Sequence, residues 1–145
     1  MAKTFDIAQP DCTFHLASST FNSKDTRACD HARTIVVGTT NILEEIRHSQ
    51  SQLIMTGSAA EYRSGLKLTE RCAREPASIY GSMKMAAHDI AERYRVAHNI
   101  RITNLCLFTP YGPWENVHRL IPSIILAALK NESIRVNDLR PTRDF

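Results

Sequence analysis

A tyrosine and a lysine four positions apart are the two residues of this chain with the clearest chemical potential. Tyr80 and Lys84 lie at the start of a predicted helix, where residues four apart share one face. A phenol normally releases its proton at about pH 10, and a neighbouring ammonium lowers that pKa. The spacing therefore predicts an acid–base unit for moving a hydroxyl proton during hydride transfer. Taken alone, such a pair is more often a packed tyrosine beside a solvated lysine.

A serine belongs to the neighbouring predicted strand end. Ser58 follows a predicted strand over 52–56 and opens a turn of small residues. Its hydroxyl can hydrogen-bond a substrate oxygen beside Tyr80. Downstream, a predicted strand over 101–108 leads into residues 109–113, which offer a threonine, a tyrosine and two prolines. These segments supply the context that makes a functional interpretation of the tyrosine and lysine more probable than the structural one.

The chain alternates strand-like and helix-like segments, which is typical of a parallel α/β sheet. The predicted strands cover residues 12–17, 52–56, 101–108 and 133–136, and the predicted helices cover residues 28–48, 78–98 and 116–130. Asn116 is the expected N-cap of the last helix, although Pro122 predicts a true start near Leu120. Ligands bind beyond the carboxyl ends of the strands in such sheets, so the candidate residues are expected along one rim.

Composition narrows the classes of protein to consider. The 145 residues suffice for one domain, and 43% hydrophobic with 23% charged residues is ordinary for a globular protein. The net charge of +3 is scattered along the chain, which argues against a nucleic-acid partner. Without a signal peptide or an apolar run of roughly 18–20 residues, we expect a cytoplasmic protein with no membrane partner. Without a secretion signal we also expect reduced thiols, and because the cysteines and histidines lack ligand spacing we expect no metal site.

Seven short segments form an ordered set of motifs along the chain: Phe14-His15-Leu16-Ala17, residues 37–44, the turn at Ser58, residues 76–84, Tyr111-Gly112-Pro113, Arg119-Leu120-Ile121-Pro122 and Arg143-Asp144-Phe145. In this order they resemble the extended short-chain dehydrogenase/reductases of the NAD-dependent sugar-nucleotide epimerase/dehydratase family. The resemblance implies an α/β fold, an incomplete Rossmann-type doubly wound parallel sheet with helices on both faces. It also implies two domains: residues 1–115 as the C-terminal part of the NAD(P)-binding domain with the catalytic residues, and 116–145 as the start of the substrate-binding region.

The resemblance implies a role for each matching residue. Tyr80 is expected to be the catalytic acid–base, Lys84 to bind the nicotinamide ribose, and Ser58 to orient the substrate hydroxyl or ketone. The expected contacts with the cofactor, NAD or NADP, are Ala17, Ser18, Tyr80, Lys84 and Phe108. The expected contacts with a nucleotide-sugar substrate are Ser58, Thr109, Tyr111, Arg119 and Arg143. A guanidinium suits bidentate binding of a diphosphate, although Arg119 also fits a solvated helix position.

The chain departs from the family pattern at several positions. The family opens with a strand followed by G-x-x-G-x-x-G, and none of the five glycines of this chain forms that motif. We therefore expect the N-terminal glycine-rich βαβ to be missing, and cofactor binding by this chain alone to be weak or absent. Ile35 and Thr109 occupy positions where relatives often carry asparagine, and Arg63 stands where glycine is common after the serine turn.

Three functions stay open. Dehydratases of the family carry acidic residues within two positions after the serine, whereas Ala59 and Ala60 follow Ser58 here and Glu61 comes third. Water elimination needs that second acid–base set, so oxidation or reduction at C4 by an epimerase or 4-keto reductase is favoured over a 4,6-dehydratase. The third alternative is a non-catalytic truncated homologue. Helices over 28–48 and 78–98 match those that pair relatives, which predicts a homodimer or a complex with a full-length relative.

Overall fold

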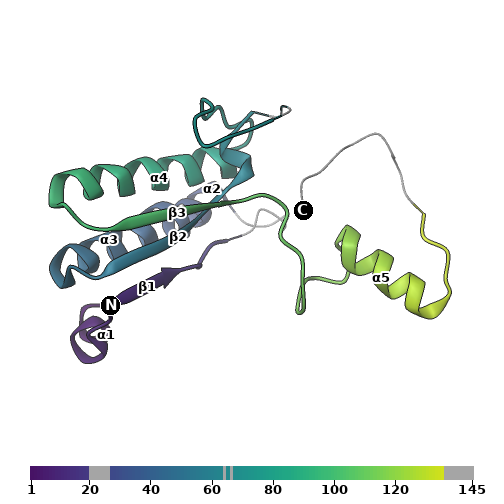
Figure 1. The fold of residues 1–145 in the computed structure, drawn as a ribbon, viewed down its shortest axis with the longest axis horizontal. Helices are drawn as coiled ribbons and strands as arrows, with labels where there is room; N and C mark the ends of the chain where they lie inside the picture. Colours follow the sequence, from purple (N-terminus) through teal and green to yellow (C-terminus); the bar gives the residue numbers. More distant parts are fainter. Residues whose placement is uncertain (20–26, 64, 66, 136–145) are drawn as a thin grey trace. The chain divides into compact units, whose positions relative to one another are not determined.

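The computed structural model describes residues 1–19, 27–63, 65 and 67–135 (Figure 1). The chain divides into two compact units, Met1–Leu107 and Phe108–Phe145, each of which is described by itself. The predicted boundary after residue 115 divides the chain by function, into a cofactor-binding and a substrate-binding part. The division into compact units does not test it, so it stays a prediction.

The first unit contains a parallel sheet of three strands. These are β1 (Cys12–His15), β2 (Gln52–Ser58) and β3 (Ile102–Leu107), in the spatial order β1-β2-β3. Phe14 pairs with Ile54 in the register of the first two strands. The predicted parallel α/β sheet is therefore confirmed, although β1 ends before the predicted limit of residue 17 and β2 extends beyond the predicted limit of residue 56.

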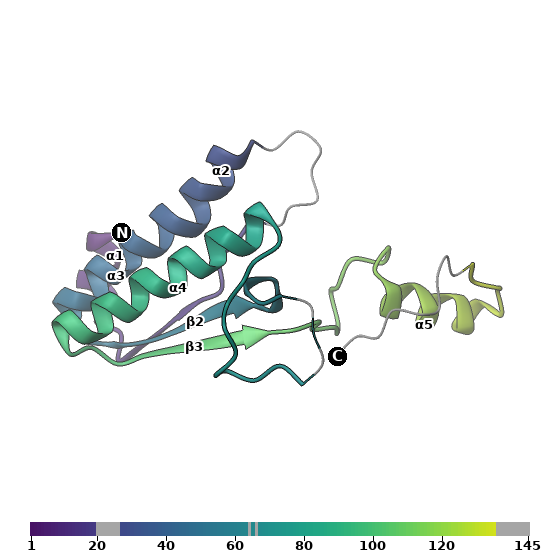
Figure 2. The same ribbon diagram turned by 90° about the horizontal axis from the view of Figure 1, so that it is seen from above.

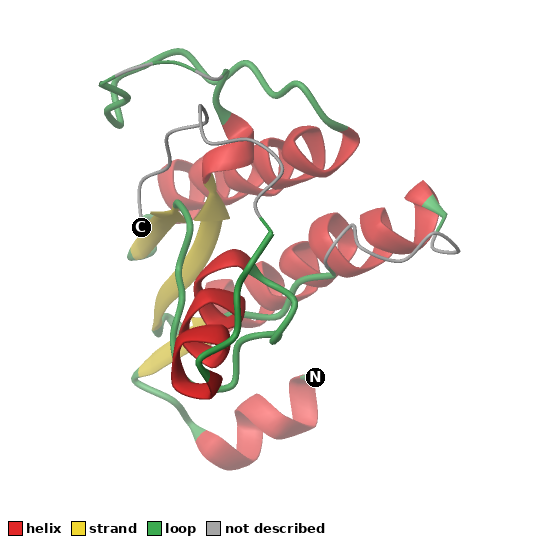
Figure 3. Cartoon of the chain, turned by 90° about the vertical axis from the view of Figure 1, so that its right-hand side faces the viewer, coloured by secondary structure: helices red, strands yellow, loops and turns green. Residues whose placement is uncertain are grey.

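Two helical crossovers connect the strands. One consists of α2 (Ala28–Ala32), the π-helical turn η1 (Arg33–Val37) and α3 (Gly38–Ser49), and the other is α4 (Ile79–His98). Figures 1 and 2 show α3 and α4 side by side on the same face of the sheet, and Figure 3 shows the same layer beside the strands. Successive parallel strands added in one direction by crossovers of one hand place their helices on one face. The helices described here cover that face, and the expected layer on the other face is not seen among the described residues.

The core lies between the helices and the sheet. Alternation along β2 buries Leu53 and Met55, because successive side chains of a strand point to opposite faces. Leu43 and Ile46 of α3, Ala91 of α4 and Ile100 belong to the same cluster of buried side chains. On the opposite face of the sheet, apolar side chains including Phe14, Leu105 and Leu107 are exposed. In the described part of the chain, the sheet therefore packs against helices on one face only.

Local sequence sets both ends of α4. Ser78 is the N-cap, and its Oγ accepts a hydrogen bond from the backbone N–H of Gly81 at 3.1 Å. Asn99 ends the helix in the left-handed conformation, with φ at 50°. The helix predicted over 78–98 is confirmed, and so is the helical segment over 28–48. The π-helical turn inside that second segment is a finding of the structure alone.

The remaining elements are short. The sequence pattern does not predict α1 (Ala2–Ala8), whereas α5 (Leu120–Lys130) begins where the proline inside it predicts. The expected N-cap at Asn116 is wrong: Arg119 is the N-cap, and Asn116 Oδ1 accepts a hydrogen bond from His118 N at 2.9 Å instead. No strand forms over the described residues 133–135, so the last predicted strand is wrong there. Every helix within the described part of the chain lacks the length or the apolar character that membrane crossing requires.

Candidate active site

The serine turn packs directly against the first turn of α4. A Cβ on Gly81 would lie 2.0 Å from the carbonyl oxygen of Ala60, so this contact requires glycine. Ala60 belongs to the turn that begins at Ser58, and Gly81 directly follows Tyr80. Lys84 lies one helical turn further on. The structure thus brings together the two segments that carry the predicted catalytic residues.

Ser58 is held by the turn that it begins. It is the N-cap of the short 3-10 helix η2 (Ala59–Glu61), and its Oγ accepts a hydrogen bond from Ala60 N at 3.2 Å. The Ser58 N–H donates to Glu61 Oε1 at 2.7 Å, which completes a capping box. Because the hydroxyl oxygen acts as an acceptor in the turn, its proton stays available for a substrate oxygen.

Lys84 is buried, with 7% of its surface exposed. Its Nζ donates to the backbone oxygen of Thr56 at 3.0 Å, near the carboxyl end of β2. Burial lowers the pKa of the ammonium, and the charge of Glu61 opposes that effect. The bond to Thr56 occupies one of the three ammonium donors, so two more can serve a ligand.

Tyr80 is half-buried on the first turn of α4. Within the described part of the chain its hydroxyl has no hydrogen-bond partner, which leaves it available to a ligand. Lys84 is bonded to the backbone of β2 rather than to the phenol. The acid–base role of the tyrosine and lysine therefore stays a prediction.

A buried histidine, His15, ends β1. His15 is 6% exposed, and its Nε2 lies 3.0 Å from Thr39 Oγ1. Thr39 donates its only hydroxyl proton to the Ile35 carbonyl at 2.6 Å, so His15 Nε2 is the donor of this pair. Burial, and next the charge of Lys84, lower the pKa of His15. Both effects disfavour the charged form of the imidazole.

This lowered pKa predicts a pH dependence of stability. The unfolded chain takes up a proton on His15 below about pH 6.5, whereas the folded chain resists it, so the free energy of unfolding falls as pH drops through that value. Urea unfolding at about pH 7.5 and about pH 5.5 measures this loss. We expect a smaller loss in His15→Gln than in the natural protein, with the exposed His48→Gln as control. An equal loss of stability in His15→Gln and His48→Gln would contradict the assignment of the pH dependence to His15.

The residues after β1 fit the predicted cofactor contacts in part. Ala17 is exposed at this end of the strand. Ser18 Oγ is buried and has no hydrogen-bond partner among the described residues. An unsatisfied buried hydroxyl is unfavourable, so a ligand atom that bonds it would be stabilising.

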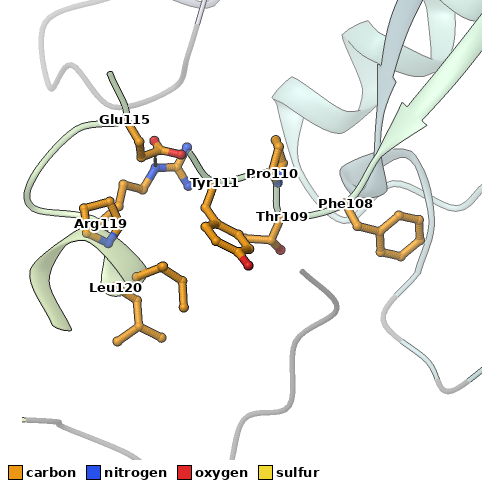
Figure 4. A pocket seen from close by; sticks show the side chains of 9 residues that line it. Phe108, Thr109, Pro110, Tyr111, Glu115, Arg119 and Leu120 are labelled. Atoms are coloured by element: carbon orange, nitrogen blue, oxygen red, sulfur yellow. Dashed lines mark ion pairs between the residues drawn. The ribbon is translucent and has the colours of Figure 1, made fainter. Parts of the chain in front are cut away.

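Four of the predicted ligand contacts belong to the second unit, where they line a pocket of about 390 Å³ (Figure 4): Phe108, Thr109, Tyr111 and Arg119. Glu115 also lines this pocket, and its Oε1 lies 3.2 Å from Arg119 Nε. Half of the Arg119 side chain is exposed, so the guanidinium can also bind an anionic ligand. Arg143 lies outside the described residues.

A buried network beneath the serine turn goes beyond the sequence-based prediction. Glu61 is fully buried, and its Oε2 lies 3.0 Å from His88 Nδ1. Glu61 and His88 are 27 positions apart in the sequence. The spacing of residues within the helix of His88 therefore could not predict this contact. The Ser-x-x-Glu pattern of a capping box is the one signal that could have pointed to Glu61. Across the described ranges, no three His, Cys, Asp or Glu side chains gather to hold a metal ion.

Comparisons of sequence and structure relate the chain to known proteins. The family model described as NAD dependent epimerase/dehydratase family matches residues 1–145. UDP-glucuronate 4-epimerase 1 of Arabidopsis thaliana is 28% identical, over 79% of this chain and 28% of its own. Protein CapI of Staphylococcus aureus is 28% identical, over 100% of this chain and 45% of its own.

The structure of UDP-glucuronic acid 4-epimerase from Bacillus cereus in complex with NAD has the same fold. Its TM-score is 0.77 at 22% identity, over 90% of this chain and 42% of that one. This chain thus spans less than half the length of the relatives just named. The match over its whole length means that the chain belongs to the NAD-dependent epimerase/dehydratase family.

Proposed function

We propose that this protein carries the catalytic part of an NAD(P)-dependent enzyme that oxidises or reduces C4 of a nucleotide-activated sugar, as an epimerase or a 4-keto reductase. The contact between the serine turn and the first turn of α4 carries this proposal, because it sets Ser58 beside the segment of Tyr80 and Lys84. Relatives named UDP-glucuronate 4-epimerase support a nucleotide sugar as the substrate.

The three side chains divide the proton chemistry. Tyr80 accepts the proton of the C4 hydroxyl during oxidation and returns it during reduction. The positive charge of Lys84, one helical turn away, attracts the negative charge that develops on the phenol oxygen during this transfer. Ser58 donates a hydrogen bond to the same sugar oxygen and so holds it in place. The cofactor, when bound, supplies the hydride acceptor and donor for C4.

The residues present fit a dinucleotide cofactor. Ser18 offers a buried hydroxyl without a partner among the described residues, and Lys84 retains free donors for ribose hydroxyls. We therefore propose that Ala17, Ser18, Tyr80 and Lys84 contact the cofactor, together with Phe108. We further propose that the pocket of the second unit contributes Thr109, Tyr111 and Arg119 to substrate binding, together with Arg143.

The burial and the hydrogen bonds of Glu61 favour an epimerase or a reductase over a dehydratase. A dehydratase needs a carboxyl group that reaches the sugar to remove a proton and to protonate the leaving hydroxyl. Glu61 follows the serine in the turn, but it is fully buried and both of its oxygens are hydrogen-bonded to protein groups. A side chain in that state is not accessible to a substrate.

The helix layer supports a proposal about assembly. Helices α3 and α4 lie side by side, and Val37 and Val96 are apolar side chains of this layer that are exposed in the described chain. We propose that these helices pair with a second copy or with a full-length relative. Burial of such apolar side chains would stabilise the complex.

The test uses the protein in the longest form that its gene encodes. We expect incubation with NAD and UDP-hexuronic acids to give the C4 epimer, with deuterium placed at C4 of the substrate retained in the product. Consumption of NADH or NADPH by a 4-keto sugar would instead indicate the reductase. A product lighter by one water would indicate the dehydratase. Absence of turnover and of cofactor binding, with a stable complex formed with a full-length relative, would support the non-catalytic alternative.

A further inference from the structure

A fully buried carboxylate lies beneath the serine turn and takes no direct part in the proposed reaction. Burial of an ionised carboxylate is unfavourable unless hydrogen bonds compensate for the lost water. Glu61 receives two such bonds, from the Ser58 N–H at 2.7 Å to Oε1 and from His88 Nδ1 at 3.0 Å to Oε2. One bond fixes the backbone of the proposed substrate-orienting residue, and the other reaches α4.

The Glu61 carboxylate joins the serine turn to two other segments, α4 and the loop before it. His88 lies on α4, and the side-chain amide of Asn104, from β3, is 2.6 Å from its Nδ1. Arg74, from the loop before α4, lies 3.8 Å from Glu61 Oε2. Arg74 Nη2 is 2.5 Å from Asp89 Oδ1, again on α4. The turn is therefore linked to α4 and to the loop that precedes α4.

The spacing along α4 gives this network a direct relation to the proposed catalytic residues. Tyr80, Lys84 and His88 are successive residues at intervals of four, so they lie along one face of the helix. Lys84 bonds the Thr56 backbone and His88 bonds Glu61, which both belong to the end of β2 and its turn. Two bonds one helical turn apart fix the helix against the strand end more firmly than either alone.

The space for the carboxylate comes from Gly57. A Cβ at Gly57 would lie 2.6 Å from Glu61 Oε1 and 2.9 Å from Asn104 Nδ2. Both atoms would have to shift to admit it. A side chain at this position thus displaces the carboxylate and leaves its charge in the protein.

We propose that Glu61 is a positioning residue, which holds the serine turn in register with the Tyr80 and Lys84 face of α4 through the placement of its hydrogen bonds rather than through its charge. This inference rests on the proposed function of these three residues. Glu61 itself touches neither substrate nor cofactor. Its effect on the reaction passes through the position of Ser58.

Two substitutions distinguish the effect of the position of the Glu61 carboxylate from the effect of its charge. Glu61→Gln removes the charge and retains an oxygen for the Ser58 N–H. Its amide nitrogen can donate to His88 Nδ1 once the neutral ring carries its proton on Nε2. Gly57→Ala retains the charge and displaces the carboxylate, and Gly65→Ala is its matched control because a Cβ there meets neighbours only at 3.8 Å and beyond. The readouts are amide hydrogen exchange at Ser58, measured by NMR, and kcat and KM for the C4 reaction.

We expect Glu61→Gln to keep Ser58 protected and kcat within about tenfold of the natural protein, because the bonding geometry survives. Gly57→Ala is expected to speed exchange at Ser58 and to lower kcat by about 100-fold with little change in KM, because Ser58 is misplaced. The reverse order of the two variants, or protection of Ser58 in Gly57→Ala, would overturn the proposal.

Hydrogen exchange can be measured without enzyme turnover. It therefore tests the positioning role of Glu61 independently of the proposed C4 reaction. A natural protein without C4 chemistry would refute the proposed function, while the exchange contrast still decides whether Glu61 holds the turn. If Gly57→Ala does not fold, Glu61→Ala takes its place. Loss of Ser58 protection in the alanine variant, with rescue by glutamine, supports positioning, and unchanged protection in the alanine variant rejects it.

Discussion

Replacement of Tyr80 by phenylalanine is expected to lower kcat for the C4 reaction by about 1,000-fold, because the substitution removes the group that exchanges the hydroxyl proton. Thermal stability should change little. The phenol is half-buried and makes no hydrogen bond within the described structure, so no native bond is lost. Steady-state kinetics with a nucleotide sugar and NAD, together with thermal unfolding of the same samples, measures both effects.

Tyr94→Phe is the matched control for this experiment. Its hydroxyl donates to Glu44 and so links α4 to α3, away from the serine turn. The control should therefore lose stability and keep its kcat, the opposite of the pattern expected for Tyr80→Phe. A Tyr80→Phe protein with nearly natural kcat would reject the acid–base role, whereas a large loss of stability would show that the hydroxyl has a structural partner.

Secondary structure was predictable where local sequence decides it. The capping serine, the helical spacing of apolar residues and the final asparagine define α4 without any tertiary information. Alternating burial likewise defines β2. By contrast, α1 has no buried residue of its own, and its Phe5 packs against the core formed by other elements. A helix that depends on such a contact is not visible in its own sequence.

The candidate site was predictable to the same extent. The order of the motifs predicted that Ser58, Tyr80 and Lys84 lie on neighbouring segments. Ser58 comes from the carboxyl end of a strand, and ligands of a parallel sheet bind at that edge. The network beneath the turn was not predictable, since His88 and Glu61 are 27 positions apart and Asn104 comes from another strand. Such bonds depend on how the elements pack, which residue spacing within one helix does not encode.

Replacement of Lys84 by methionine is expected to have opposite effects on function and stability. Cofactor-dependent turnover should fall by about 100-fold or more, because the proposed ribose contact and the positive charge one helical turn from the phenol are both lost. The free energy of unfolding at neutral pH should rise by about 1 kcal/mol, because desolvation of a buried ammonium costs more than one hydrogen bond to Thr56 returns. Lys130→Met, on the exposed end of α5, is the control and should change neither quantity.

The pH dependence of this gain identifies its cause. Burial lowers the pKa of Lys84 below the value of 10.5 that applies to the unfolded chain, so between those two values the unfolded chain binds more protons than the folded one. The cost of the buried charge is therefore complete below the lowered pKa and disappears as pH rises towards 10.5. Urea unfolding of the natural protein and of Lys84→Met should accordingly differ most at neutral pH and converge in alkaline solution. A methionine variant that is less stable at neutral pH would show that the ammonium is held by stronger bonds than the one to Thr56, and that its burial is part of what stabilises the fold.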